Sequence, residues 1–371
     1  MITRHEFNAL AISNMTAPTH EQQFDLWGEP IADSAPIKTV AAKRTAIILP
    51  AAPSAAVIAI AQNLPVSIHA RIHLGTSSWS FAGWEGLVYS AHYAETRLAR
   101  DGLSAYSQHP LFRCVGIDRT FYAPIAEKDY VRYAAQVPEH FHFMVKAPMA
   151  VTSAYVRNEN GTFSDSPHFL DVEYAINEFI APCTAGLGAK VGPMIFQFPP
   201  QGRAITGTAR AQDAWINRLY RFLKELPPGF LYAVEIRDPE LLTERFLKCL
   251  KATQVKLCVA SHARMPSPKE QIAIMNRVLE PGPFIARWSL HAGFKYEDAK
   301  AKYFPFNKLV DEDWDSRQSL AQASLDAWRA GYAAFVIVNN KAEGSAPLSI
   351  EKLAACIGDE YHRTTETVQP T

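Results

Sequence analysis

The sequence shows no excess of charge of either sign. Its 371 residues include 37 Lys and Arg and 37 Asp and Glu, so the formal net charge is zero when the histidines are neutral. Proteins whose whole surface attracts nucleic acid or anionic membranes carry a strong positive charge, so the sequence does not favour a nucleic-acid partner. A local basic cleft remains compatible with this composition.

Cysteines and long apolar runs are also scarce. The five cysteines are odd in number and none belongs to a CxxC pair. This argues against a disulfide framework or a zinc knuckle and favours a reducing cytoplasm. The most apolar N-terminal stretch, 45–61, contains Pro50 and Pro53 and is too short to cross a membrane. We therefore expect a cytoplasmic protein with no membrane partner.

Motifs with a strong catalytic signature are missing as well. The sequence has no Walker loop, GxGxxG fingerprint, HExxH pair or GxSxG elbow. Asp118, Glu235, His262 and His291 could converge on a metal ion, but nothing in their spacing demands one. We predict neither a metal nor a cofactor.

The sequence does contain a regular alternation of strand-like and helix-like segments. Short runs rich in β-branched and aromatic residues, bounded by Gly, Pro or polar clusters, predict eight strands at 73–79, 113–121, 142–147, 194–198, 231–237, 257–262, 284–288 and 333–340. Amphipathic stretches between them predict helices at 127–137, 172–187, 209–226, 241–250, 269–279 and 316–330, with a last one at 348–357 that Gly358 would end.

This alternation predicts an α/β protein built as a single (β/α)₈ barrel of the TIM type. Strands alternating with helices imply parallel strands and right-handed crossovers, and eight units over about 285 residues fit the usual size of a closed barrel. An open doubly wound sheet is the structural alternative. Residues 1–70 are rich in Ala and Pro and show no clear period. They predict a partly irregular N-terminal extension before a barrel domain at 71–371.

Polar side chains gather at the C-terminal ends of the predicted strands. In the run 231–237, Val234 and Ile236 suit the side facing the helices, so Glu235 and Arg237 should point into the barrel. Comparable reasoning places further polar residues at the ends of other strands: Asp118, Lys146, Gln197, Arg287, Asn339 and Asn340. Because barrel active sites form at this end, we predict one site there.

The residue types in this set suggest their roles. Cations slightly outnumber carboxylates, which suits a ligand bearing a phosphate or a carboxylate. Glu235 is the preferred acid or base, since burial would raise its pKa and a neighbouring cation would lower it; Lys146 and Asp118 complete the predicted catalytic group. The predicted substrate-binding residues are Arg237, Arg287, Gln197, Asn339, Asn340, Tyr122, Trp79 and His291. Each of them alone has an equally simple structural explanation, as an ion pair or as core packing.

Several short segments together resemble one known family. They are Gly75-Thr76-Ser77-Ser78-Trp79-Ser80, Thr120-Phe121-Tyr122, Val145-Lys146-Ala147-Pro148, Phe196-Gln197-Phe198-Pro199-Pro200, Val234-Glu235-Ile236-Arg237-Asp238-Pro239 and Asn339-Asn340. In this order, over about 72–358, the chain resembles the YecE-like family, a domain of unknown function numbered 72. The resemblance implies a TIM-type barrel and no established reaction, and it gives added weight to the polar residues at the strand ends as one site.

Two departures from the family pattern concern that site. The family usually has a Glu two positions before the polar residue of its second strand, where this chain has Gly116 before Asp118. The seventh strand of the family normally reads Arg-Leu-His-Gly, whereas here three residues separate Arg287 from His291. One expected carboxylate is therefore missing, and the place of His291 stays open.

Three functions remain open at this stage. The first is an enzyme that acts on a small anionic or sugar-like molecule by acid–base chemistry. The second is a metal-dependent phosphoesterase, with nucleic acid as one candidate substrate. The third is a non-catalytic binding protein that uses Trp79, Trp84, Tyr89 and Tyr122 as a recognition surface. The sequence identifies neither the substrate nor the oligomeric state.

Overall fold

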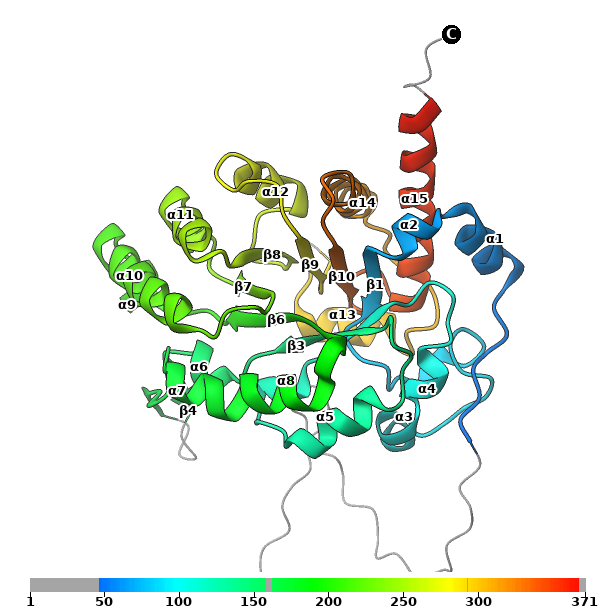
Figure 1. Cartoon of the computed structure of the whole chain (residues 1–371), viewed down its shortest axis with the longest axis horizontal. Coiled ribbons are helices and arrows are strands. Elements are labelled where there is room, and N and C mark those ends of the chain that lie inside the picture. Colours follow the sequence, from blue (N-terminus) through cyan, green and yellow to red (C-terminus); the bar gives the residue numbers. More distant parts are fainter. Residues whose placement is uncertain (1–46, 158–161, 292, 367–371) are drawn as a thin grey trace, which may run out of the picture. The chain divides into compact units, whose positions relative to one another are not determined.

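Eight parallel strands close into a barrel, in the order β1-β10-β9-β8-β7-β6-β3-β2 (Figure 1). The computed structural model describes residues 47–157, 162–291 and 293–366. The barrel strands are β1 (Ile72–Thr76), β2 (Cys114–Ile117), β3 (His142–Lys146), β6 (Val191–Phe198), β7 (Tyr232–Ile236), β8 (Lys256–Ser261), β9 (Phe284–Trp288) and β10 (Ala334–Val338). All eight coincide with the predicted runs, so the predicted (β/α)₈ barrel is confirmed.

Helices surround the barrel on its outside (Figure 1). Those between the strands are α3 (Glu95–Asp101), α4 (Leu103–Tyr106), α5 (Glu127–Ala134), α6 (Met149–Thr152), α7 (Val172–Ala175), α8 (Ala181–Leu187), α9 (Arg203–Thr206), α10 (Ala209–Glu225), α11 (Glu244–Thr253), α12 (Pro268–Asn276), α13 (Tyr296–Tyr303) and α14 (Trp314–Arg329), and α15 (Ala346–Glu366) follows the last strand. None of the helices in the described part of the chain is both long and apolar enough to cross a lipid bilayer.

Alternation along each strand divides the core into two layers. On β6, the outward Phe196 packs edge-on against Phe179 and Phe222 of the surrounding helical layer, with ring centroids 6.0 and 5.2 Å apart. Inward side chains of seven strands, all but β1, form one apolar cluster inside the barrel, which contains Cys114, Met144, Ile195, Ala233, Cys258, Ile285, Phe335 and Ile337. On most strands the next inward position towards the C-terminal end is polar. The polar site therefore lies directly on the C-terminal side of this apolar cluster.

Two helices differ from the sequence prediction for identifiable reasons. The segment 172–187 is helical throughout but widens into a π-turn at Ile176–Ile180, just before Pro182, which has no N–H to donate to the preceding turn. Gly358 was expected to end the last helix and that was wrong, because α15 continues to Glu366. Next to Gly358 lies Asn63, whose carbonyl is hydrogen-bonded to His362, so tertiary packing prolongs the helix.

Part of the predicted N-terminal extension lies against the barrel. Helices α1 (Ala55–Asn63) and α2 (Val66–His69) precede β1, and the Ser67 carbonyl accepts a hydrogen bond from Trp328 of α14. The Ala51 N–H donates to the Val88 carbonyl at 2.9 Å. Residues 1–46 of the predicted extension lie outside the described residues. The sequence did not predict α13 or the small hairpin of β4 (Tyr155–Arg157) and β5 (Phe163–Asp165).

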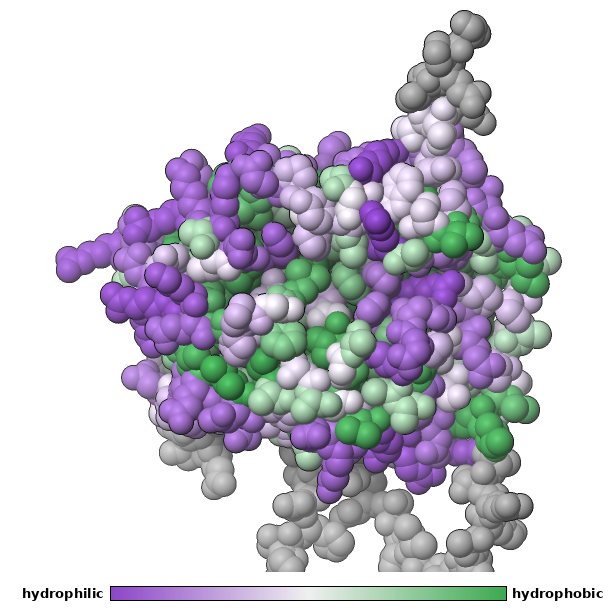
Figure 2. Space-filling model, viewed as in Figure 1, coloured by the Kyte–Doolittle hydropathy of each residue, from purple (hydrophilic) through white to green (hydrophobic). Residues whose placement is uncertain are grey.

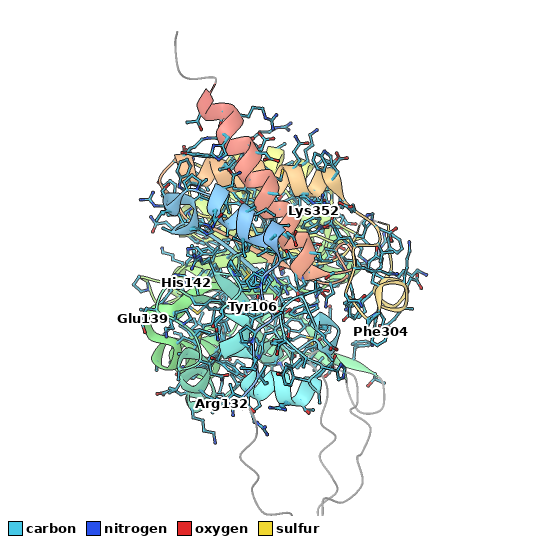
Figure 3. The ribbon with its side chains drawn as sticks, turned by 90° about the vertical axis from the view of Figure 1, so that its right-hand side faces the viewer. Tyr106, Arg132, Glu139, His142, Phe304 and Lys352 are labelled. Atoms are coloured by element: carbon cyan, nitrogen blue, oxygen red, sulfur yellow. The ribbon has the colours of Figure 1, made fainter. Side chains whose placement is uncertain are left out.

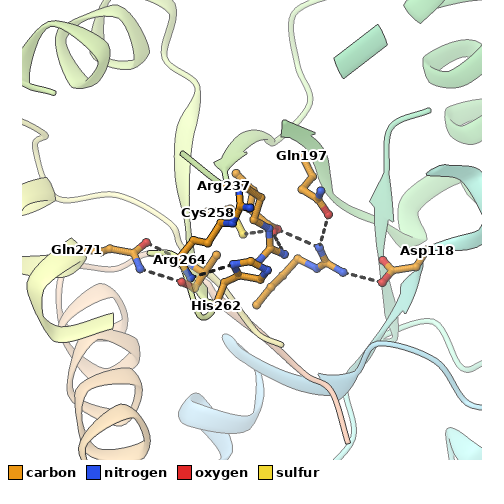
Figure 4. Close-up of polar contacts among 10 residues, drawn as sticks. Asp118, Gln197, Arg237, Cys258, His262, Arg264 and Gln271 are labelled. Carbon is orange, nitrogen blue, oxygen red and sulfur yellow. Dashed lines mark hydrogen bonds and ion pairs between the residues drawn. The ribbon is translucent and has the colours of Figure 1, made fainter. Parts of the chain in front are cut away.

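A side chain of helix α12 bonds to the backbone of β8 where the pairing between β7 and β8 ends. The register of these strands ends at Val234 and Leu257, so nearer the C-terminal end the backbone of Ala260 lacks a partner on β7. Gln271 of α12 supplies one: its amide accepts from the Ala260 N–H at 3.2 Å and donates to the Ala260 carbonyl at 2.8 Å (Figure 4). Gln271 thus satisfies both backbone groups of Ala260 where β7 provides no partner.

The two ends of the barrel differ in chemistry. A side view separates them: Glu139 and His142, where β3 begins, lie on one side, and Phe304, in a loop after β9, lies on the other (Figure 3). The view of the N-terminal end shows hydrophobic residues near the centre and hydrophilic ones around the rim (Figure 2). At this end the buried His73 stacks on Phe335 and meets His142 edge-on, with ring centroids 4.5 and 4.7 Å apart.

The buried His73 should make stability depend on pH. Burial, together with the charges of His142 and Arg113, lowers the pKa of His73 to about 3. Between pH 6.5 and 3 the unfolded chain binds a proton there that the folded protein does not, so stability falls as the pH falls through this range. From pH 6.5 to pH 5, H73L should lose about 1–2 kcal/mol less stability than the wild type, measured by urea unfolding.

His92 offers a matched control, because its side chain is 71% exposed and its ring stays in solvent whether the chain is folded or not. H92L should therefore show the wild-type pH dependence. Equal pH dependence in all three proteins would contradict the role given to His73.

Candidate active site

Arg287 lies at the centre of an ion-pair network across the barrel mouth. From the end of β9, its Nη2 donates to Asp118 Oδ2 at 2.6 Å and its Nη1 to Glu235 Oε2 at 2.9 Å, with a longer contact to Gln197 Oε1 at 3.5 Å (Figure 4). Burial alone would lower the pKa of Arg287, but the two carboxylates raise it. This guanidinium therefore stays charged and joins β2, β6 and β7 through the lumen.

Glu235 is enclosed between two guanidinium groups. Its side chain has no exposed surface, and a second ion pair joins its Oε1 to Nη2 of Arg237. Cys258 Sγ lies 3.8 Å from Oε2. Burial raises the pKa of Glu235, yet the charges of Arg237, Arg287 and Lys146 together bring it down to about 2. The carboxylate is therefore ionised at any physiological pH.

Lys146 is the cation of this polar cluster that forms no ion pair with a carboxylate of the described residues. It ends β3, is 9% exposed, and its Nζ lies 3.7 Å from the ring centroid of Phe121. Within the described residues its ammonium makes no hydrogen bond and no ion pair. Burial lowers the pKa of Lys146 to about 7, with the charge of Arg287 adding to the effect and that of Asp118 opposing it. At neutral pH this amine is therefore about half protonated.

Arg237 offers a second unused donor. Its side chain is 8% exposed, and its Nη1 is buried with no hydrogen-bond partner among the residues that the structure describes. Burial lowers the pKa of Arg237, while the charge of Glu235 raises it. A buried donor without a partner costs about 1–3 kcal/mol, and more when it is charged. The mouth thus contains two cationic groups that a bound anion would satisfy.

Asn339 and Asn340 shape the rim of the mouth. The amide of Asn339 donates to Ser77 Oγ at 2.9 Å, which links β10 to β1. Asn340 accepts from Trp84 Nε1 at 3.2 Å and from the Ala346 N–H at the start of α15 at 2.8 Å. Asn339 lies with the cluster at the strand ends, whereas Asn340 holds together the loops behind it.

The other three predicted substrate-binding residues differ in position. Trp79 is 4% exposed, donates to the Leu98 carbonyl at 3.0 Å and packs edge-on against Tyr133, which gives it a packing role beneath α3 and α5. Tyr122 is 51% exposed, beside Phe121. His291 packs edge-on against Phe294.

The four residues considered as metal ligands do not form a ligand set. No group of three or more His, Cys, Asp or Glu side chains that could hold a metal ion occurs in the described part of the chain. Asp118 and Glu235 instead bind Arg287. His262 accepts a hydrogen bond from the Arg264 N–H through its Nδ1.

The sequence did not indicate which residues support the polar cluster through contacts with Lys146 and with β8. The Thr120 hydroxyl donates to the Lys146 carbonyl, and the ring of Phe121 faces the ammonium of the same lysine. Thr120 and Phe121 belong to the Thr-Phe-Tyr segment of the family resemblance, but neither side chain is of a type that indicates catalysis. Gln271 lies on α12, the helix that follows β8, and its amide gave no sign that it would bond to the strand backbone.

Removing the central guanidinium should destabilise the protein strongly. R287L would leave Asp118 and Glu235 as buried carboxylates with too few partners, at an expected cost of about 3–5 kcal/mol in urea unfolding. The double variant R287L/D118N should recover part of this loss, because Asp118 has Arg287 as its ion-pair partner, whereas Glu235 keeps Arg237.

The surface variant R329L is the matched control. Arg329 pairs with Asp326 at 3.1 Å, and that carboxylate is 58% exposed, so the loss should stay below about 1 kcal/mol. Equal losses for R287L and R329L would show that the network in the mouth does not support the fold.

Comparison with known proteins identifies the family of this chain. The model of the family described as "Protein of unknown function DUF72" matches residues 73–371. The UPF0759 protein YecE of Escherichia coli K12 is 25% identical over 173 residues, which are 47% of this chain and 51% of that protein; the same figures hold for the protein from E. coli O157:H7. The chain thus spans about half the length of the curated relatives that it matches.

Two solved structures are similar to the fold. A DUF72 family protein from Enterococcus faecalis V583 superimposes with a TM-score of 0.53 at 19% identity, covering 77% of this chain and 95% of that one. A DUF72 family protein from Thermotoga maritima MSB8 gives a TM-score of 0.52 at 17% identity, with 79% and 99% covered. At these identities the similarity shows the fold alone. Because the family model covers the barrel from its first strand onwards, the chain belongs to the DUF72, or YecE-like, family of proteins of unknown function.

Proposed function

We propose that this protein is an enzyme that binds a small anionic ligand, bearing a carboxylate or a phosphate, at the C-terminal mouth of its barrel. The observation that carries the proposal is a pair of buried cationic atoms, Nζ of Lys146 and Nη1 of Arg237, to which the described residues give no hydrogen-bond partner, beside the saturated Arg287. Arginine and lysine are the usual partners of these anions, and an enclosed site strengthens the attraction.

The charges of the cluster support an anion rather than a cation. Asp118 and Glu235 supply two negative charges, and Arg237 and Arg287 supply two positive ones, so a protonated Lys146 leaves one positive charge uncompensated. A buried charge of this kind is costly unless it is paired. A ligand anion would pair it and would raise the pKa of Lys146 towards its ordinary value.

Lys146 suits proton transfer better than Glu235, the residue preferred from the sequence. A general acid or base is most effective when its pKa lies near the working pH. The pKa of Lys146 is about 7, whereas that of Glu235 is about 2. We therefore propose that Lys146 carries protons and that Glu235 holds the two arginines in position. Asp118, which binds Arg287 through Oδ2, shares this second role.

The alternative functions have less support in the geometry. A metal-dependent phosphoesterase would need carboxylates that are here bound to Arg287. A binding protein that used the aromatic set would need it at the surface, but Trp79, Trp84 and Tyr89 are at most 4% exposed. A cavity of about 550 Å³ between α11, α12 and α14 lies at the opposite, N-terminal end of the barrel, away from the unpaired cations. A cytoplasmic location and the absence of a nucleic-acid partner stay predictions.

Anion binding should depend on Lys146 and on pH. Lactate, phosphate and sulfate, tested by thermal shift and calorimetry, should include at least one anion that stabilises the wild type, and K146M should weaken its binding by about 10- to 100-fold. Because only the protonated amine attracts an anion, affinity in the wild type should fall as the pH rises above 7, by up to about tenfold per pH unit. Comparison with K146M corrects for the titration of phosphate itself.

Lys256 provides the control. It is also partly buried, and burial lowers its pKa, but it begins β8 at the other end of the barrel. K256M should bind anions like the wild type. If none of the anions stabilises the wild type, or if K146M binds as well as K256M does, the proposed site is wrong.

A further inference from the structure

We propose that Lys146 is a nucleophile, whose ε-amine condenses with the carbonyl group of an aldehyde or ketone that also carries a carboxylate or a phosphate. The product is an imine that links the substrate to the end of β3. This inference rests on the proposed function, since the acid group of the substrate would occupy the anion site beside Nη1 of Arg237. It adds a reacting group and a substrate class that anion binding alone does not imply.

The surroundings of Lys146 differ from those of another buried lysine in the chain. Lys190 is 8% exposed, but its Nζ donates to the carbonyls of Ala134 and Val137 at 2.8 Å each and lies 3.3 Å from Glu139. Three oxygen atoms thus surround the ammonium of Lys190. The Nζ of Lys146 instead faces the ring of Phe121 at 3.7 Å, and an aromatic ring attracts a cation without accepting a strong hydrogen bond.

The position of Lys146 suits attack on a bound molecule. Its main-chain carbonyl accepts a hydrogen bond from the Thr120 hydroxyl, which fixes the strand end from which the side chain projects. The side chain is 9% exposed, at the barrel end where substrates enter. With a pKa of about 7, roughly half of these amines are neutral near pH 7 and carry a free lone pair.

Every atom of the condensation can be accounted for. The amine nitrogen attacks the carbonyl carbon, a C–N bond forms, and the π electrons of the C=O bond move to oxygen, which receives the proton that nitrogen loses. The carbinolamine then loses its hydroxyl group, with one added proton, as water, and the nitrogen lone pair forms the C=N bond. Solvent at the barrel mouth, which the 9% exposed side chain of Lys146 reaches, can relay these protons.

Reductive trapping tests the imine directly. The full-length protein is incubated at pH 7 with sodium cyanoborohydride and either glyoxylate, pyruvate or glycolaldehyde phosphate, and the modified lysine is located by peptide mass spectrometry. We expect Lys146 to be modified at least tenfold faster than any other lysine, as carboxymethyl-lysine in the glyoxylate arm. The carboxylate and phosphate arms show which acid group the site accepts. Neutral acetaldehyde should label Lys146 at least tenfold more slowly than the preferred anionic probe.

Two variants and a competitor complete the design. K146M should lose the labelling and K256M should keep it, and an excess of an anion without a carbonyl group that binds the site, such as lactate, should protect Lys146. Because the wild-type protein reports the labelled position by itself, the test does not depend on the folding of K146M. Labelling spread evenly over the lysines, or equal rates for acetaldehyde and the anionic probes, would overturn the inference. If anions still bind at Lys146 in that case, the proposed function stands without the nucleophile.

Discussion

The guanidinium of Arg287 is the group on which the C-terminal half of this barrel depends. Arg287 projects from β9, yet its partners lie on β2, β6 and β7, none of which is adjacent to β9 in the barrel. Strand pairing fixes neighbours only, whereas these contacts run across the lumen. They close the apolar interior towards the mouth and hold the two carboxylates at fixed places.

Because Arg287 satisfies the carboxylates, Lys146 is left without one. If Asp118 or Glu235 were unpaired, its charge would hold the ammonium of Lys146 and raise its pKa. Instead the acids are bound at 2.6 and 2.9 Å by a group that cannot lose its proton under physiological conditions. The reactivity assigned to Lys146 is therefore a consequence of ion pairs in which Lys146 takes no part.

The sequence predicts the barrel well because alternation along a strand is a local property. Val234 and Ile236 are enough to turn Glu235 and Arg237 inward, and the same reasoning places Lys146 and Gln197 at the mouth. Partners across the lumen are not local, so the sequence could not show that Glu235 lies between two guanidinium groups, and its acid–base role was inferred from its expected burial beside a neighbouring cation.

The same limit applies to residues whose surroundings come from distant segments. Trp79 has the residue type of a recognition surface, but α3 and α5 cover it. Gly358 has the residue type of a helix end, but the contact with the segment before β1 keeps it helical. In both cases tertiary packing, which no short pattern encodes, decides the outcome.

Gly116 explains why the second carboxylate of this site is an aspartate at the strand end. A side chain at 116 would point into the barrel, and its Cβ would meet the Ser77 carbonyl oxygen at 3.0 Å and the Ser77 Cα at 3.1 Å. The glutamate expected from the family resemblance would therefore require the backbone of Ser77, which follows β1 and bonds to Asn339, to shift by a few tenths of an ångström. Asp118 has the same orientation two residues later, about 6–7 Å nearer the mouth. The carboxylate that binds Arg287 is thus displaced towards the solvent-facing end of the barrel, where Lys146 and an incoming anion would meet.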